Sequence, residues 1–220
     1  MPETSIVCRA ILFDLDGVLV NSLDSIERIL REWATEHGLD GDEAVALSPG
    51  RRDIDIIRVL APHLDAELAT QEIVARERMD FSGLTTLPRT AELLNGLPSD
   101  SWAIVTSGTR TVAEGRLRAV GLPIPRVFVT AGDVTDGKPH PDGYLAAARM
   151  LGVAPEDAVV IEDAVAGAEA ARAAAMRCIG VGDAFPGADS LAARVSGVDQ
   201  LVVTSGPGGL TITLPAQRNG

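Results

Sequence analysis

Residues 7–19 read Val-Cys-Arg-Ala-Ile-Leu-Phe-Asp-Leu-Asp-Gly-Val-Leu, a mostly apolar run in which two aspartates follow the phenylalanine. We expect residues 7–13 to form a buried strand that carries Asp14 and Asp16 at its carboxyl end. Because the two aspartates are two positions apart at a strand end, their side chains can point toward the same opening. The fold and the chemistry are both predicted by working outward from this stretch.

Short apolar runs alternate with amphipathic stretches through most of the remaining chain. Further strands are expected at residues 102–106, 127–130, 158–161 and 178–181. The helices expected between them span residues 109–120, 144–151 and 164–175. This alternation predicts an α/β protein with a doubly wound, Rossmann-like parallel sheet. Near the end of the chain, the turn at 205–209 is expected to join two short strands, 201–204 and 210–214.

One block of helices interrupts the alternation. Helical segments are expected at residues 23–37, 53–60 and 66–78, with no strand between them. This pattern predicts a small helical lobe inserted after the first strand. We therefore divide the chain into a core of residues 1–21 and 85–220 and an inserted α-helical cap of residues 22–84. Lids of this kind open and close on hinges, expected here near residues 18–22 and 81–87, with Gly83 in the second.

The composition restricts the possible partners. The chain has 19 Lys and Arg against 31 Asp and Glu, a formal net charge of −12, which argues against binding to nucleic acid or to an anionic membrane. No signal peptide or membrane span is expected, so the predicted location is the cytoplasm. Cys8 and Cys178 are far apart in sequence and are expected to be buried and unpaired. We expect a monomer.

Ligands of a doubly wound sheet bind beyond the carboxyl ends of its strands. Four acidic residues are expected at that edge: Asp14 and Asp16 after the first strand, and Glu162 and Asp163 after the strand at 158–161. Like charges this close repel one another, and a divalent cation would relieve the repulsion. A ligand set of oxygen atoms alone favours Mg²⁺ over zinc. Turn and helix capping is the simpler role for any one of these residues, but it does not explain why all share one edge.

The same edge is expected to carry groups that bind phosphate. Ser107 offers a hydroxyl and Gly108 an unhindered backbone N–H near the start of a helix, where anions are favoured. Lys138 is the only lysine among the 19 basic residues, and it offers a compact positive charge. A carboxylate such as Asp14 can attack a phosphate ester and form an aspartyl-phosphate, while Asp16 supplies and later removes a proton. These parts together predict phosphoryl transfer.

Four segments carry a resemblance to a known family. Phe13-Asp-Leu-Asp-Gly-Val-Leu19, Val105-Thr-Ser-Gly108, Gly137-Lys-Pro139 and Val160-Ile-Glu-Asp163 resemble the four motifs of the haloacid dehalogenase-like phosphatases, in the family's order. The resemblance implies Asp14 as nucleophile, Asp16 as acid and base, and Ser107 and Lys138 as phosphate ligands. It also implies that Asp14, the Asp16 carbonyl and Asp163 bind Mg²⁺, and that the inserted helices form a cap that selects the substrate.

Several stretches are also similar to the glycerol-phosphate and 2-deoxyglucose-6-phosphate phosphatases of that family. They are Gly50-Arg-Arg-Asp-Ile54, Trp102-Ala-Ile-Val-Thr-Ser-Gly-Thr-Arg110, Gly132-Asp-Val, Gly137-Lys-Pro-His-Pro141 and Glu162-Asp-Ala. This similarity implies a small sugar or polyol phosphate as substrate. Asn21, Arg51 and Arg52 are candidates to contact it from the cap, since an arginine fork suits hydroxyl or phosphate oxygens. A solvated cap face is the competing interpretation.

Other functions fit the sequence less well. Residues 132–138 fit the P-loop pattern GxxxxGK, but Pro139 follows and offers neither a hydroxyl nor an N–H. A dehalogenase has no leaving alkoxide to protonate and would not need Asp16, and a non-catalytic phosphate-binding module would not need intact catalytic motifs. No nucleotide-binding GxGxxG follows a strand, and no GxSxG is present. A hexose phosphomutase resembling β-phosphoglucomutase shares every core motif, and it remains the alternative.

Overall fold

A computed structural model describes residues 4–185 and 191–215. Its centre is a six-stranded sheet in the order β6-β5-β2-β7-β8-β9, in which every neighbouring pair is parallel. The strands are β2 (Ala10–Phe13), β5 (Trp102–Val105), β6 (Val127–Val129), β7 (Ala158–Glu162), β8 (Arg177–Val181) and β9 (Ala193–Val195). The predicted α/β class with a doubly wound parallel sheet is confirmed.

Helices cover both faces of this sheet because its central strands bury side chains on both sides. Ile11 and Phe13 face the apolar cluster shared with α5 (Thr90–Gly96) and α6 (Arg110–Ala119). Between these two residues, Leu12 faces the opposite cluster, shared with α7 (Asp142–Leu151) and α8 (Val165–Ala173). A strand alternates its side chains in this way, so one short segment contributes to two hydrophobic cores.

The first predicted strand is two strands in the structure. β1 (Thr4–Cys8) pairs antiparallel with β11 (Gly209–Leu214), which pairs in turn with β10 (Val202–Gly206). The chain then passes Arg9, whose N–H donates to the Asp157 carbonyl at 2.7 Å, and enters the parallel sheet as β2. The expected single strand over residues 7–13 was therefore wrong, whereas the pair of short strands near the end of the chain is confirmed.

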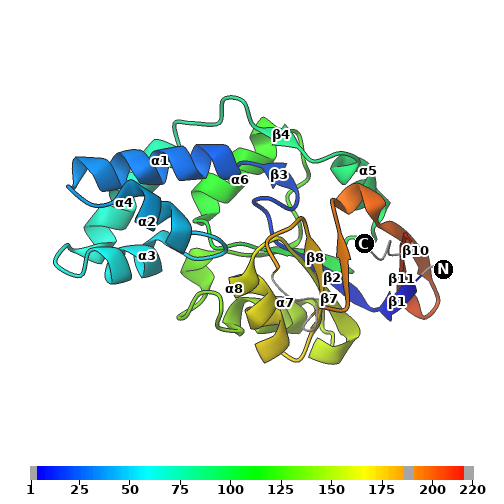
Figure 1. Cartoon of the computed structure of the whole chain (residues 1–220). Coiled ribbons are helices and arrows are strands. Elements are labelled where there is room, and N and C mark those ends of the chain that lie inside the picture. Colours follow the sequence, from blue (N-terminus) through cyan, green and yellow to red (C-terminus); the bar gives the residue numbers. More distant parts are fainter. Residues whose placement is uncertain (1–3, 186–190, 216–220) are drawn as a thin grey trace.

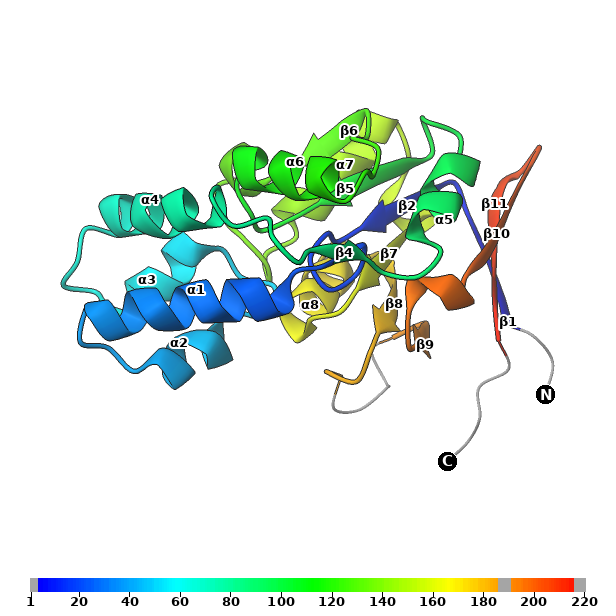
Figure 2. The same ribbon diagram turned by 90° about the horizontal axis from the view of Figure 1, so that it is seen from above.

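Four helices, rather than the three expected, form a separate helical unit. They are α1 (Leu23–Glu36), α2 (Gly41–Leu47), α3 (Asp53–Leu60) and α4 (Ala66–Glu77), and they enclose an apolar cluster of their own around Trp33. Asp40 begins the unexpected α2 by accepting hydrogen bonds from the N–H groups of Asp42 and Glu43. In Figures 1 and 2 this unit lies at one end of the molecule, and the sheet of β1, β10 and β11 lies at the other.

Two chain segments connect the helical unit to the sheet, and they lie side by side. β3 (Val20–Asn21) and β4 (Thr85–Thr86) form an antiparallel pair across this junction. Gly83, just before β4, has a positive φ of 76°, which glycine adopts readily. Cys8 and Cys178 are buried and unpaired, as predicted. In the described part of the chain no helix is long and apolar enough to cross a bilayer.

Candidate active site

The strand register brings the predicted site residues to one edge of the sheet. Phe13 of β2 lies beside Ile104 of β5 and Ile161 of β7, so the residues that follow these three strands emerge together. They line a cavity that holds about 900 Å³ of empty space, part of it open to solvent. From the sheet side the cavity is lined by Asp14, Asp16, Thr106, Ser107, Gly108 and Asp163. The far wall comes mainly from the helical unit.

Lys138 lies between two carboxylates at the base of the site. Its Nζ is 2.5 Å from Asp14 Oδ1 and 2.5 Å from Glu162 Oε1, and all three side chains are buried. Burial by itself would lower the pKa of Lys138, but the two carboxylates outweigh that effect and raise it. The lysine is therefore a fixed positive charge. It restrains Oδ1 of Asp14, while no described residue donates a hydrogen bond to Oδ2.

Glu162 is held by several donors at once. Besides Lys138, it accepts hydrogen bonds from the Tyr144 hydroxyl at 3.0 Å and from the Ala164 N–H at 2.9 Å. A Cβ at Gly167 would lie 1.7 Å from Glu162 Oε1, so only glycine leaves room for the carboxylate. In this arrangement Glu162 positions Lys138, and Tyr144 fixes Glu162 in turn.

Three carboxylates lie close enough to share a cation. One oxygen from each of Asp14, Glu162 and Asp163 lies within 4.8 Å of the others. Burial, followed by the charges of Asp14 and Glu162, raises the pKa of Asp163 to about 9. No described residue donates a hydrogen bond to the Asp163 carboxylate. An unpartnered acid beside two further carboxylates fits a hard divalent cation held by oxygen ligands.

The pKa of Asp14 is also displaced from its usual range. Burial is the largest cause and raises it, the charge of Lys138 opposes that change, and Glu162 and Asp16 add to it, with a result of about 7. A cation bound at Asp14 and Asp163 would favour the ionised form of both carboxyl groups. The ionised form is the one that can act as a nucleophile.

Asp16 is held by residues on both sides. Ser22 Oγ donates to Asp16 Oδ1 at 2.5 Å, and Arg116 Nη1 donates to Asp16 Oδ2 at 2.8 Å. Arg116 Nη2 also donates to Glu77 Oε1 of α4 at 2.6 Å, with both side chains buried. Sequence reasoning missed Arg116 and Glu77. The sequence did indicate that Arg116 is buried, because it falls on the same face of α6 as the buried Val112, Ala113 and Leu117.

Ser107 and Gly108 lie between β5 and α6 and line the cavity. Ser107 Oγ donates a hydrogen bond of 2.7 Å to the carbonyl oxygen of Gly50, which belongs to the helical unit. The Gly108 N–H donates to Thr106 Oγ1 at 3.1 Å. Both groups are therefore at the carboxyl edge of the sheet, as expected, and each has a hydrogen-bond partner within the chain.

The three further candidates for contact with the substrate have different surroundings. Arg51 lines the cavity and is exposed. Arg52 is buried, because its Nε pairs with Asp55 at 2.6 Å and its Nη1 donates to the Thr135 carbonyl at 3.1 Å. Asn21 is exposed in β3 and does not line the cavity. The expectation that Arg52 and Asn21 contact substrate does not fit their positions. Arg52 instead ties α3 to the loop before Lys138.

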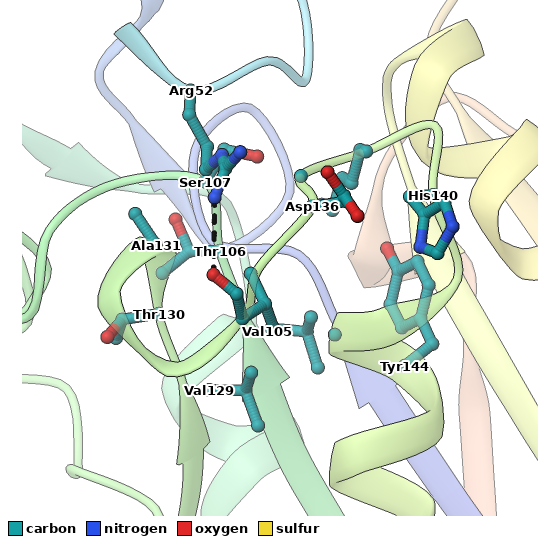
Figure 3. A pocket seen from close by; sticks show the side chains of 14 residues that line it. Arg52, Val105, Thr106, Ser107, Val129, Thr130, Ala131, Asp136, His140 and Tyr144 are labelled. Carbon is teal, nitrogen blue, oxygen red and sulfur yellow. Dashed lines mark hydrogen bonds between the residues drawn. The ribbon is translucent and has the colours of Figure 1, made fainter. Parts of the chain in front are cut away.

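A second, smaller cavity lies behind Arg52. It holds about 310 Å³ of empty space, part of it open, and Figure 3 shows Arg52 on one side of it and Tyr144 and His140 on the other. The Arg52 guanidinium lines this space and is already paired with Asp55. Apolar side chains such as Val105 and Val129 form much of its lining.

This fold and this arrangement of carboxylates, serine and lysine define a family. The chain belongs to the haloacid dehalogenase-like hydrolases, whose family model matches residues 8–175. It is therefore an enzyme of the hydrolase class. The predicted resemblance to this family is confirmed by the match.

Particular relatives are similar over nearly the whole chain. Hexitol phosphatase A of Escherichia coli is 40% identical over 92% of this chain and 97% of its own. Glycerol-1-phosphate phosphohydrolase 2 of Saccharomyces cerevisiae is 33% identical over 82% of this chain and 77% of its own. Among solved structures, a hydrolase from Pseudomonas syringae superposes with a TM-score of 0.76 at 25% identity, covering 86% of this chain and 94% of its own.

Proposed function

We propose that this hydrolase is a Mg²⁺-dependent phosphatase of small sugar or polyol phosphate monoesters that acts through an aspartyl-phosphate. The observation that carries the proposal is the placement of Asp14: Oδ1 is bound to Lys138 at 2.5 Å, and Oδ2 accepts no hydrogen bond from a described residue. Asp14 and its neighbours line a cavity large enough for a sugar phosphate. The names of the similar E. coli and yeast proteins support the substrate class.

The first half of the reaction transfers the phosphoryl group to the protein. Asp14 Oδ2 attacks phosphorus, and the bond from phosphorus to the substrate's alkoxide oxygen breaks. Asp16 gives its proton to that oxygen, so the product leaves as a neutral alcohol. Lys138 and the Ser107 hydroxyl hold the phosphoryl oxygens, replacing the Gly50 carbonyl that Ser107 contacts in the structure. The Gly108 N–H is available to the same oxygens.

The second half of the reaction returns the protein to its starting state. Asp16, now ionised, removes a proton from a water molecule, whose oxygen attacks phosphorus. The bond between phosphorus and Asp14 breaks, which releases inorganic phosphate and restores the Asp14 carboxylate. Arg116 and Ser22 keep the Asp16 carboxylate pointed into the cavity in both halves. Catalysis of this kind depends on positioning and on charge placed in advance.

Mg²⁺ fits the donor set at this edge and would be held by Asp14, Asp163 and the Asp16 carbonyl. When bound, it would neutralise charge on the transferring phosphoryl group. Glu162 was also expected to bind the metal. Its oxygens already accept hydrogen bonds from Lys138, Tyr144 and the Ala164 N–H, and we assign it to positioning Lys138.

The helical unit is the proposed cap of residues 22–84, which moves relative to the core of residues 1–21 and 85–220. Its hinges would lie at the β3 and β4 junction, where Gly83 is free of close neighbours. Closure brings Gly50 against Ser107 and Glu77 against Arg116, as in this structure. Arg51, at the exposed end of the cavity, would steer an anionic substrate into a protein with a net charge of −12.

The test is release of inorganic phosphate from a panel of hexitol phosphates, glycerol phosphates, hexose 6-phosphates and p-nitrophenyl phosphate. We expect phosphate release to require Mg²⁺ and to stop when a chelator is added. In Asp14→Asn the rate should fall at least about a thousandfold. Full activity in Asp14→Asn would overturn the assignment of the nucleophile. Conversion of β-glucose 1-phosphate to glucose 6-phosphate without release of phosphate would identify a phosphomutase instead.

A further inference from the structure

The far wall of the active-site cavity has an acidic character that the phosphatase chemistry does not use. Among the described residues that line the cavity, the helical unit contributes the carboxylates of Glu27, Asp53 and Glu77 and one guanidinium, that of Arg51. Asp53 is the first residue of α3, and Glu77 is the last residue of α4. Glu27 is exposed and Glu77 is paired with Arg116, so Asp53 is the partly buried carboxylate of this wall that has no ion-pair partner among the described residues.

Asp53 differs from Glu77 in its surroundings. No described residue donates a hydrogen bond to its carboxylate, although the side chain is partly buried and lines the cavity. Burial is the largest cause that raises its pKa to about 8; the charges of Glu77 and Asp16 add to the effect, and the charge of Arg116 opposes it. A polar group left unpaired in a partly dry site is costly, unless a ligand supplies the missing hydrogen bonds.

The cations nearest this wall are already engaged. Arg116 uses Nη1 for Asp16 and Nη2 for Glu77, and Arg52 pairs with Asp55 outside the cavity. Arg51 lies at the exposed end, where water screens its charge. Among the described residues at the buried end, no guanidinium or ammonium is left to pair with an anion on the organic part of a substrate.

We propose that Asp53 is a specificity-determining residue that binds a hydroxyl group of the substrate's organic part and disfavours substrates with a second anionic group there. This inference rests on the proposed phosphatase function. The carboxylate accepts a hydrogen bond from a hydroxyl, and the protonated carboxyl both donates and accepts one, so either form serves a polyol or sugar. Neither form attracts a second phosphate, and the ionised form repels it.

The proposal separates the phosphatase from the phosphomutase. A phosphomutase must hold a bisphosphate intermediate in two orientations, so each phosphate occupies the far end of the cavity in turn. At that end the second phosphate would meet Asp53 and Glu77 instead of a free cation. The same wall therefore favours substrates with one phosphate and a hydroxyl-bearing chain.

The experiment compares two substrates that differ by one phosphate, fructose 6-phosphate and fructose 1,6-bisphosphate, together with a hexitol 6-phosphate and p-nitrophenyl phosphate. The variants are Asp53→Asn, which keeps the shape, and Asp53→Arg, which supplies a cation. Asp24→Asn is the matched control, because Asp24 is an exposed aspartate in the same helical unit that does not line the cavity. Values of kcat/KM are measured for each protein and substrate.

We expect the wild-type protein and Asp24→Asn to prefer the monophosphate over the bisphosphate by at least about tenfold. Asp53→Arg should lower that ratio by at least about tenfold. Asp53→Asn should reduce kcat/KM for the hexitol phosphate, and this reduction should be roughly three- to tenfold larger than the reduction for p-nitrophenyl phosphate, which has no hydroxyl chain. The ratios are internal to each preparation, so a loss of folded protein cancels.

Failure of this inference is distinguishable from failure of the proposed function. Without Mg²⁺-dependent, Asp14-dependent hydrolysis of any monoester, the proposed function and this inference both fall. With such hydrolysis present, either of two results overturns the role of Asp53 alone. One is equal kcat/KM for the mono- and bisphosphate in the wild-type protein, and the other is ratios that neither Asp53 variant changes.

Discussion

Arg116 Nη1 donates a hydrogen bond of 2.8 Å to Asp16 Oδ2, and this contact joins the start of the chain to a helix 100 positions later. The same guanidinium reaches Glu77 of the helical unit at 2.6 Å, so it spans the proposed core and cap. Burial alone would lower the pKa of Arg116, but Asp16 and Glu77 outweigh that and raise it. One buried charge therefore orients the proposed acid and is itself held by the cap.

Arg116→Met is expected to destabilise the protein strongly, because it leaves the carboxylates of Asp16 and Glu77 unpaired. Removal of one partner from a buried ion pair costs about 3–5 kcal/mol in free energy of unfolding. Urea denaturation measures the change. Arg118→Met is the control on the same helix, where Arg118 is exposed and pairs with Glu114. Its cost should stay below about 1 kcal/mol, and equal costs for both variants would contradict the role of the buried pair.

Gly17→Ala is expected to weaken Mg²⁺ binding. A Cβ at Gly17 would lie 2.0 Å from Asp163 Oδ2, so the carboxylate would have to move away from Asp14. Gly17 also has a φ of 76°, which adds backbone strain in any other residue. The Mg²⁺ concentration for half-maximal phosphate release should rise by about tenfold or more, as expected when a metal ligand is displaced.

Gly38→Ala separates the two effects. Gly38 has a φ of 70° and no atom near the position of an added Cβ, so its substitution carries the same kind of strain without a clash. It should reduce stability modestly and leave the Mg²⁺ requirement unchanged. A similar rise in that requirement for both variants would show that strain, and not displacement of Asp163, is responsible.

The position of the site at one edge of the sheet was predictable, because polar residues directly follow each apolar strand in the sequence. Asp14, Ser107 and Asp163 come together through strand register, which follows from a parallel sheet. Pairings between distant side chains were not predictable: nothing local relates Arg116 to Glu77, which is 39 positions away. Arg52 is a different case, since Asp55, three residues later, is a partner that helical spacing offers.

Short elements were harder to predict than the site. The seven-residue α2 begins at a glycine and has too few turns to show a clear apolar period, so only its Asp40 cap marks it. The division of residues 7–13 into two strands depends on pairing with β11, near the other end of the chain. Apolar character alone does not reveal which sheet a residue joins.

Stability in the absence of metal should fall as the pH rises. The pKa values of Asp14 and Asp163 are raised to about 7 and about 9, against an ordinary value of 3.8, so the folded state binds protons more tightly than the unfolded chain. These two groups make their full stabilising contribution to the free energy of unfolding below about pH 4. The contribution is lost as the pH rises through their raised folded-state pKa values.

Mg²⁺ should reverse this trend, because it binds the ionised carboxylates. Thermal unfolding with and without Mg²⁺ should show a larger rise in Tm at about pH 8 than at about pH 5.5, since protons must leave for the metal to bind. The rise should be much smaller at both pH values in Asp163→Asn. A Tm increase independent of pH would contradict the assignment of these two aspartates as metal ligands.

Lys138→Met should abolish activity and make stability more dependent on pH. Without the ammonium group, Asp14 and Glu162 face each other with no counter-charge, so the pKa of Asp14, which the charge of Lys138 now lowers, should rise further. The loss in free energy of unfolding should approach about 3–5 kcal/mol near neutral pH and shrink at about pH 5, below the raised pKa of Asp14, where that carboxyl group becomes protonated. The double variant Lys138→Met with Glu162→Gln removes one of the two acids, and it should recover part of that loss while remaining inactive. The opposite result, a double variant less stable than Lys138→Met at neutral pH, would contradict this role of the lysine. It would mean that the hydrogen bonds that Glu162 accepts from Tyr144 and Ala164 stabilise the protein more than the repulsion between Glu162 and Asp14 destabilises it.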